Sequence, residues 1–150
     1  MLKQKLKEEL KQSMLARNVL KTSVLRLLLS AINYYEIQKG GAGYEATDED
    51  VLSVIQKEAK QRRDSIEEYK KAARQELVDK ETKELEMLQD YLPQQMSEDE
   101  IKSLVKEAIN QTGAKTIAEM GKVMGALMPK VKGKADGGMV SRIVRESLSK

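Results

Sequence analysis

Hydrophobic residues recur along the chain at the three- and four-residue spacing of amphipathic helices. In the first segment, about residues 2–16, the apolar positions follow one another four residues apart: Leu2, Leu6, Leu10 and Met14. This spacing predicts a lysine-rich helix with a narrow apolar stripe. The next segment, about residues 19–38, follows the capping residue Asn18 and is apolar on most of its circumference. We expect such a helix at the centre of a bundle, covered on several sides.

Two more helices are predicted before a break at Pro93. The first, about residues 47–74, opens at the N-cap residue Thr47, and its first turn is acidic, where the helix dipole favours negative charge. The glycine-rich stretch 40–43 before it predicts a flexible connection. The second helix spans about residues 75–92 and stops because proline cannot continue a helix.

Three short helices are predicted after Pro93, each with its own start signal. Ser97 and Glu100 form a capping box for a helix over about 98–112, which ends at the C-cap Gly113. A second box opens at Thr116, and Asp136 is the expected N-cap of a last helix, over about 137–148. The sequence thus predicts an all-α fold, with a bundle of about four helices at residues 1–93 and a three-helix subdomain at residues 94–150.

The composition narrows the range of functions. The 150 residues contain no cysteine and no histidine, and neither tryptophan nor phenylalanine. Disulfides, thiolate nucleophiles and sulfur-ligated metals are excluded, and the commonest metal ligand and proton shuttle is missing. We therefore expect no catalytic residue, no metal site and no cofactor. No apolar run is long enough to span a membrane, and the opening lacks a signal-peptide pattern, so the predicted compartment is the cytoplasm.

Charge is distributed unevenly although the net charge is only +3. Residues 1–30 carry 7 Lys/Arg against 2 acidic residues, residues 31–114 carry 12 against 19, and residues 115–150 carry 8 against 3. The basic ends indicate an anionic partner such as a nucleic acid. They are equally compatible with attraction to the acidic middle of the same fold.

The stretch LMPKVKGKADGGMVSRIV at 127–144 contains the densest basic cluster. Lys130, Lys132 and Lys134 surround Gly133, which lets the backbone approach a partner closely, and the following helix begins at Gly137 with free N–H groups. Such combinations bind phosphates. However, Asp136 competes for those N–H groups, so an ordinary turn between two helices is the alternative interpretation. Arg142 and Arg145 extend the basic face or else pair with Glu146 or with the C-terminal carbonyls of their own helix.

Other charged groups favour structural interpretations. Lys60, Arg62 and Arg63 share one helical turn, but acidic neighbours make a solvated helix surface more plausible than a phosphate site. The carboxylates between residues 67 and 86 alternate with lysines and arginines at helix-neighbour spacing, which indicates a solvated face with weak ion pairs. The acidic triplet at 48–50 lacks the rest of a calcium loop and is better explained by helix capping.

Four stretches of the chain together resemble the YqeY family: RLLLSAI at 26–32, KEAKQRRDSIEEY at 57–69, YLPQQMSEDEI at 91–101 and MGKVMGALMPKVKGKADGGMVSRIV at 120–144. The last stretch is also similar to the tail domain of the B subunit of the glutamine-dependent Asp-tRNA/Glu-tRNA amidotransferase. The resemblance covers nearly the whole chain. It implies an N-terminal helical bundle followed by a small three-helix unit.

The resemblance also implies a functional surface, because the related amidotransferase tail engages tRNA. Carried over position by position, it adds one lysine to the basic cluster and gives these RNA-facing candidates: Lys122, Lys130, Lys132, Gly133, Lys134, Asp136, Gly137 and Arg142. Arg145 joins them from the charge pattern. A carbon–nitrogen ligase activity with glutamine as amido donor is also assigned to the family by similarity. That chemistry belongs to parts of the amidotransferase outside the shared tail.

Three hypotheses follow from the sequence. The first is a helical adaptor that binds tRNA or another structured RNA and has no active site of its own. The second is a module that binds a protein of the aminoacylation or amidation machinery. The adaptable methionines Met120, Met124, Met128 and Met139 are an argument for it, although packing in the core is the more common use of such residues. The third is an independent carbon–nitrogen ligase.

Overall fold

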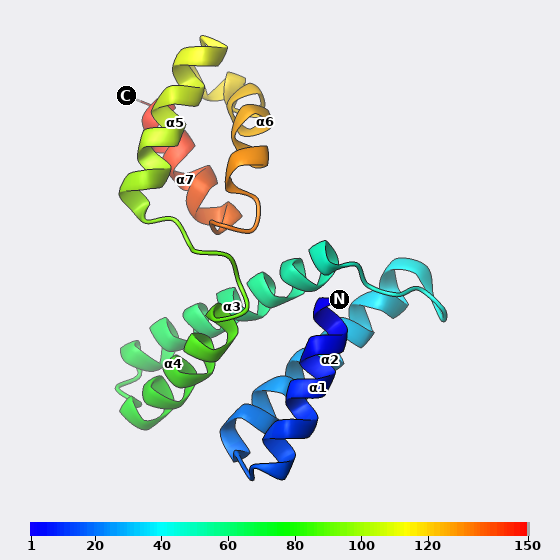
Figure 1. The fold of residues 1–150 in the computed structure, drawn as a ribbon. Coiled ribbons are helices and arrows are strands. Elements are labelled where there is room, and N and C mark those ends of the chain that lie inside the picture. The colour runs from blue at the N-terminus through cyan, green and yellow to red at the C-terminus, as the bar shows by residue number, and fades with distance from the viewer. Residues whose placement is uncertain (150) are drawn as a thin grey trace. The chain divides into compact units, whose positions relative to one another are not determined.

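The computed structural model of the protein describes residues 1–149 and confirms the all-α prediction: these residues form seven α-helices and one 3₁₀ turn, with no strand among them (Figure 1). The chain divides into two compact units, Met1–Leu92 and Pro93–Lys150. Within the described part of the chain, no helix is both long and apolar enough to cross a membrane.

Four helices build the first unit: α1 (Leu2–Leu15), α2 (Val19–Gly40), α3 (Asp48–Lys71) and α4 (Gln75–Gln89). The predicted caps are confirmed. The Asn18 side chain accepts a hydrogen bond from the Lys21 N–H at 3.1 Å, and Thr47 forms a capping box with Asp50. α4 ends three residues earlier than predicted, with Asp90 as its C-cap. The proline therefore follows the end of the helix instead of stopping it directly.

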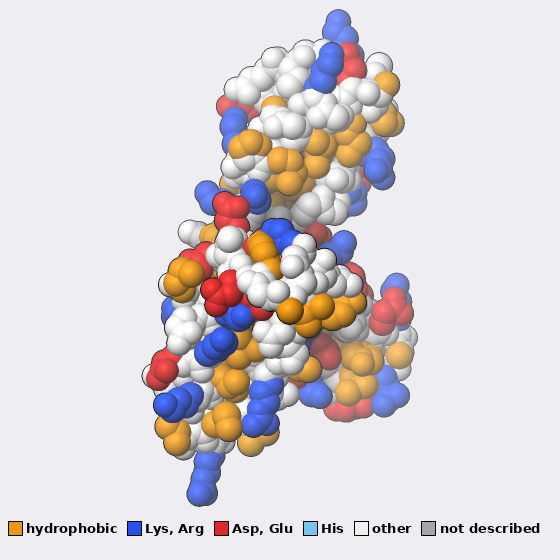
Figure 2. Space-filling model, turned by 90° about the vertical axis from the view of Figure 1, so that its right-hand side faces the viewer, with side chains coloured by type: hydrophobic (Ala, Val, Ile, Leu, Met, Phe, Trp, Pro, Cys, Tyr) orange, Lys and Arg blue, Asp and Glu red, His pale blue; other side chains and the backbone are white. Residues whose placement is uncertain are grey.

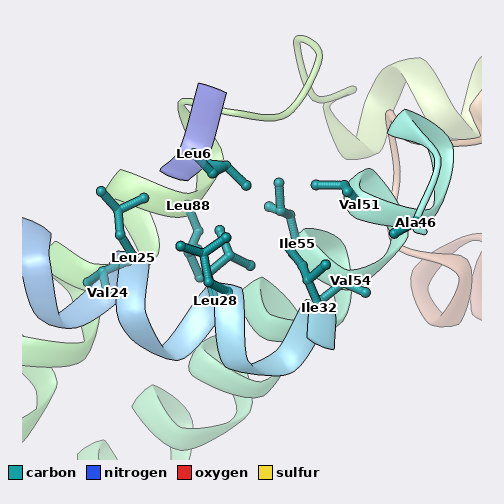
Figure 3. Close-up of a cluster of buried hydrophobic side chains, with 11 residues drawn as sticks. Leu6, Val24, Leu25, Leu28, Ile32, Ala46, Val51, Val54, Ile55 and Leu88 are labelled. Carbon is teal, nitrogen blue, oxygen red and sulfur yellow. The ribbon is translucent and has the colours of Figure 1, made fainter. Parts of the chain in front are cut away.

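Side chains from all four helices converge in the core of the first unit (Figure 3). Leu6 comes from α1, Leu25 and Leu28 from α2, Ile55 from α3 and Leu88 from α4, and each is at most 1% exposed. Aliphatic residues thus fill the space that aromatic residues occupy in many other cores.

One face of α2 differs from the prediction. Leu25, Leu28 and Ile32 of this helix are buried in the core, but the opposite side of the helix is not covered by other helices. Leu27 is 53% exposed and Ile37 is 65% exposed. The expectation of a helix covered on several sides was wrong because the other three helices pack against one half of its circumference only.

A buried ion pair joins α3 and α4, which the sequence interpretation also missed. Arg62 Nε lies 3.3 Å from Glu84 Oε2, and Arg62 Nη1 lies 3.2 Å from Glu58 Oε2. Both Arg62 and Glu84 are buried, so neither belongs to the solvated faces predicted for them. The burial of both residues could have been predicted from their positions. Arg62 follows the buried Ala59 by three residues and Glu84 precedes the buried Leu88 by four, and residues three or four apart share one face of a helix. The carboxylates Glu67 and Glu68 are exposed, as predicted.

The second unit contains α5 (Glu98–Thr112), the 3₁₀ turn η1 (Ile117–Glu119), α6 (Met120–Val131) and α7 (Gly137–Leu148). The predicted capping box at Ser97 and the left-handed C-cap at Gly113, with φ 68°, are confirmed. Its core is aliphatic and separate from that of the first unit, with fully buried residues from each of its three α-helices: Ile101, Val105, Val123, Leu127, Val140 and Val144.

Candidate nucleic-acid interface

The turn between α6 and α7 holds the basic cluster in a defined backbone conformation. α6 ends at Val131, and Gly133 adopts φ 79°, a left-handed conformation that L side chains rarely adopt. The Lys134 N–H donates to the Val131 carbonyl at 2.9 Å, which closes the turn. The sequence requires glycine here because the chain must reverse direction within five residues.

The segment just before α5 fixes this turn from the side. The Met96 N–H donates to the Lys134 carbonyl at 2.8 Å, and the Gln95 side-chain amide donates to the Gly133 carbonyl at 3.0 Å. Two carbonyls of the turn are therefore occupied, while its lysine side chains remain exposed. A turn held in this way presents its charges to a ligand without first losing backbone entropy.

Lys130, Lys132 and Lys134 all lie on the surface of this turn and its preceding helical end. Lys130 Nζ lies 3.8 Å from Glu107 Oε1, and both side chains are about half exposed, so this pair is weak. Lys134 has no carboxylate within 4.0 Å among residues 1–149. Three exposed lysines thus lie within five residues, at the end of α6 and in the turn that follows it.

Asp136 caps α7, as predicted: its Oδ1 accepts a hydrogen bond from the Gly138 N–H at 3.2 Å. One of the first N–H groups of α7 is therefore already bonded to a carboxylate. Gly137 and Gly138 are exposed and carry no Cβ, so the backbone at the start of α7 is accessible. Asp136 reduces the positive potential at this helix end, and an anion is better bound by the lysines beside it.

Arg142 forms ion pairs with acidic side chains. The sequence had left open whether it does so or extends the basic face. Its guanidinium contacts Glu98 at 3.0 Å and Glu146 at 3.3 Å, and the hydrogen bond with Glu98 is the main cause of its raised pKa. The residue connects α7 to the start of α5. Arg145, one turn further along, is exposed and has no carboxylate within 4.0 Å among the described residues.

Lys122 lies in the first turn of α6, about 12 Å along the helix axis from Lys130. It is exposed, and its charge contributes to the lowered pKa of Glu119, after the hydrogen bonds from the Lys115 and Thr116 N–H groups. The structure therefore groups Lys130, Lys132 and Lys134 and places Lys122 at the other end of α6.

The net charge of the protein belongs to the second unit. Residues 1–92 carry 17 Lys/Arg and 17 Asp/Glu, whereas residues 93–150 carry 10 Lys/Arg and 7 Asp/Glu. Figure 2 shows Lys and Arg side chains alternating with acidic and hydrophobic ones over the face drawn. No group of His, Cys, Asp or Glu side chains in the described part of the chain is arranged to hold a metal ion.

Sequence reasoning missed a polar cluster in the first unit. Asp50 Oδ1 accepts hydrogen bonds from Tyr35 at 2.8 Å and Lys39 at 2.7 Å, and its Oδ2 accepts from Tyr44 at 2.6 Å and the Thr47 N–H at 3.0 Å. These bonds, led by that of Lys39, hold the pKa of Asp50 far below its usual range. Because all four lone-pair positions are occupied, the cluster stabilises the fold and leaves no position for a ligand.

A second carboxylate lies beside this cluster and connects three segments. Glu36 Oε1 accepts a hydrogen bond from Lys3 Nζ at 2.6 Å and from the Ala46 N–H at 2.8 Å. The bond from Lys3 is the main cause of the lowered pKa of Glu36. The start of α1, the end of α2 and the segment before α3 are thereby joined.

Comparison with known proteins identifies the family. A family model described as Yqey-like protein matches residues 3–148. A protein named altered inheritance of mitochondria protein 41, mitochondrial, of Pyrenophora tritici-repentis is 39% identical over 105 residues, which cover 67% of this chain and 56% of that protein. Its namesake in Clavispora lusitaniae is 34% identical over 111 residues, covering 73% and 63%.

A third relative with the same name, from Lachancea thermotolerans, is 40% identical over 90 residues, which cover 59% of this chain and 46% of the relative. The chain spans about half the length of these curated relatives. The family match, in contrast, extends over nearly all of the chain and includes both helical units. The chain belongs to the YqeY-like protein family.

Proposed function

We propose that this protein is an adaptor that binds RNA, most directly tRNA, through the basic turn formed by Lys130, Lys132 and Lys134, and that it has no active site of its own. One observation supports this proposal above the others: three exposed lysines share one turn, whose backbone is fixed by hydrogen bonds from Gln95 and Met96. The similarity of this stretch to the tRNA-engaging amidotransferase tail agrees with it.

Phosphate groups are the part of an RNA that such a turn recognises. Lysine is a flexible point charge, and three lysines within five residues suit adjacent phosphates better than they suit base edges. Binding of this kind depends on RNA shape and charge and discriminates little between sequences. Arg142 plays a positioning role in this proposal, because its two ion pairs tie α7 to α5.

Filter binding of labelled tRNA to lysine variants tests the proposal. Lys132→Ala and Lys134→Ala should each weaken binding several-fold and nearly uniformly across tRNA sequences, because each removes a phosphate contact. A triple variant with alanine at 130, 132 and 134 should bind far more weakly. The matched control replaces Lys70, Lys71 and Lys80, three exposed lysines of the first unit, and should leave binding unchanged. Equal losses in both triple variants, or no binding by the unmodified protein at low salt, would contradict the proposal.

Two other activities implied by the sequence are separated from RNA binding by simple assays. A protein partner from the aminoacylation machinery would survive nuclease treatment in a pull-down, whereas partners bridged by RNA would not. A ligase would convert Glu-tRNA to Gln-tRNA with glutamine and ATP. We expect the isolated chain to show no such conversion.

The compartment is part of the same proposal. The sequence predicts the cytoplasm, whereas the fungal relatives carry the word mitochondrial in their names. Both compartments contain tRNA and translation machinery, so the proposed binding is compatible with either one.

A further inference from the structure

α2 presents an apolar stripe on the side opposite its core. Four large residues on this side are exposed: Val19 80%, Leu27 53%, Tyr34 62% and Ile37 65%. Successive helical residues are about 100° apart, so these four, together with the exposed Ser23 and Ser30, fall within a sector of about 80°. We call these six residues the α2 stripe.

The α2 stripe contains no charged residue, although 34% of the chain is charged. Every charged residue of α2 lies outside the sector: Lys21, Arg26, Glu36 and Lys39. The stripe runs for about 27 Å along the helix, from Val19 to Ile37. Four large exposed apolar residues on one side of a helix, interrupted only by small serines, indicate an interaction site.

A groove of about 740 Å³ adjoins the first half of the stripe. Its lining includes Met14 at the end of α1, the stripe residues Val19, Ser23 and Leu27, and two arginines beside the stripe, Arg17 and Arg26. The stripe thus has a hollow at one end and the exposed ring of Tyr34 near the other.

We propose that the α2 stripe binds the α2 stripe of a second copy of the chain in antiparallel orientation, forming a two-fold symmetric dimer. In such a pair, residue i faces residue j and residue j faces residue i. When Tyr34 faces Ser23, the same register brings Leu27 opposite Ser30 and Val19 opposite the Ile37 end. Tyr34 and Leu27 then each meet a serine, Val19 packs against the Ile37 end, and each Tyr34 enters the groove of the other copy.

The parallel alternative lacks this complementarity of size. In a parallel in-register pair, Tyr34 would face Tyr34 and each serine would face a serine, leaving gaps between bulky contacts. Close packing favours large side chains opposite small ones. The antiparallel register is therefore the one that this sequence of large and small residues selects. The inference concerns α1 and α2 only, so it does not depend on RNA binding by the basic turn.

Sedimentation analysis of the full chain from about 1 to 300 µM tests the dimer, because this range covers the weak affinities of small interfaces. The unmodified chain should be dimeric at the upper end. Leu27→Glu and Tyr34→Glu should be monomeric with unchanged helical circular dichroism, since both positions are exposed in the single chain. Ile117→Glu, at a residue 48% exposed in the second unit, is the matched control and should dimerise normally. A monomer throughout the concentration range, or a dimer unaffected at both α2 positions, would overturn the proposal.

Cysteine cross-linking tests the orientation, because the chain has no cysteine of its own. In the antiparallel register the two copies of residue 30 are offset by about 4.5 Å along the helices, whereas those of residue 23 are offset by about 16 Å. With a copper–phenanthroline oxidant, Ser30→Cys should therefore form a disulfide-linked dimer and Ser23→Cys should not. Linking of both variants would indicate the parallel arrangement, and linking of Ser23→Cys alone would also contradict the proposal.

Discussion

Two residues of the first unit, Asp50 and Arg62, are charged side chains held inside a helical bundle. Asp50 accepts four hydrogen bonds, and Arg62 lies between the carboxylates of Glu58 and Glu84. A buried charge is costly unless its partners are in place. These two clusters therefore make the bundle sensitive to single substitutions that an apolar core alone would tolerate.

Asp50→Asn should destabilise the first unit at neutral pH, because the amide cannot replace a carboxylate as acceptor for Lys39 and Tyr44 at once. The pKa of Asp50 is lowered on folding, so its contribution is complete above the unfolded-state pKa of about 3.9 and is lost as the pH falls further. Urea unfolding at pH 7 and pH 3 measures this. The difference in the free energy of unfolding between the variant and the unmodified protein should be smaller at pH 3 than at pH 7. A difference that stays constant or grows would contradict the account.

Arg62→Met should lower the free energy of unfolding by about 3 kcal/mol, because it leaves Glu84 buried without its partner. The double variant with Met at both 62 and 84 should recover most of that loss, because an apolar pair of similar volume packs in the same space. Chemical unfolding of the two variants gives both values. If the double variant were less stable than Arg62→Met, the ion pair would not be the main contribution of Arg62.

At the scale of the helices, the ends were predictable where a local signal sets them. Asn18, Thr47, Ser97, Gly113 and Asp136 act as caps in the structure because each bonds to backbone groups within a few residues. The end of α4 and the uncovered side of α2 were predicted wrongly, since both depend on what other helices cover.

In the candidate site, too, features set by neighbouring residues were predictable and features set by distant residues were not. The three lysines of the basic turn are close in sequence, so their proximity in space followed from the pattern. The pairing of Arg142 with Glu98 joins residues 44 positions apart and had no local signal. Binding of RNA at this turn remains a prediction.

The end of α2 offers a test of close packing between a helix and the segment that follows it. A Cβ added at Gly40 would lie 2.7 Å from Tyr44 Cβ, closer than real Cβ contacts allow. Gly40→Ala should therefore destabilise the first unit by about 1–3 kcal/mol, by displacing Tyr44 from Asp50.

Gly125→Ala is the matched control, because this position lies inside α6 and an added Cβ would meet nothing within 4 Å beyond the adjacent residues and the backbone of its own helix. It should stabilise its helix by up to about 1 kcal/mol. Thermal unfolding compares the two variants. If both substitutions changed the unfolding temperature by the same amount and in the same direction, contact with Tyr44 would not be the reason for glycine at position 40.

At the scale of the whole molecule, the two units differ in charge and, in our proposals, in role. The first unit is electrically neutral and carries the apolar α2 stripe, and the second holds the entire net charge of +3 and the basic turn. Separate surfaces for a second copy and for RNA mean that each can be removed without affecting the other. We therefore expect Leu27→Glu to change the oligomeric state while the salt dependence of RNA binding per chain stays the same.

The central claim is that the lysines of the α6–α7 turn bind phosphates, and the salt dependence of tRNA affinity tests it most directly. Each lysine that neutralises a phosphate releases counterions, so the affinity falls linearly with salt on a logarithmic plot. Replacement of Lys130, Lys132 and Lys134 by alanine should lower the slope by about three, one for each lost contact. The control at Lys70, Lys71 and Lys80 should keep the original slope. An unchanged slope in the 130/132/134 variant would contradict the account, because the phosphates would then be bound elsewhere.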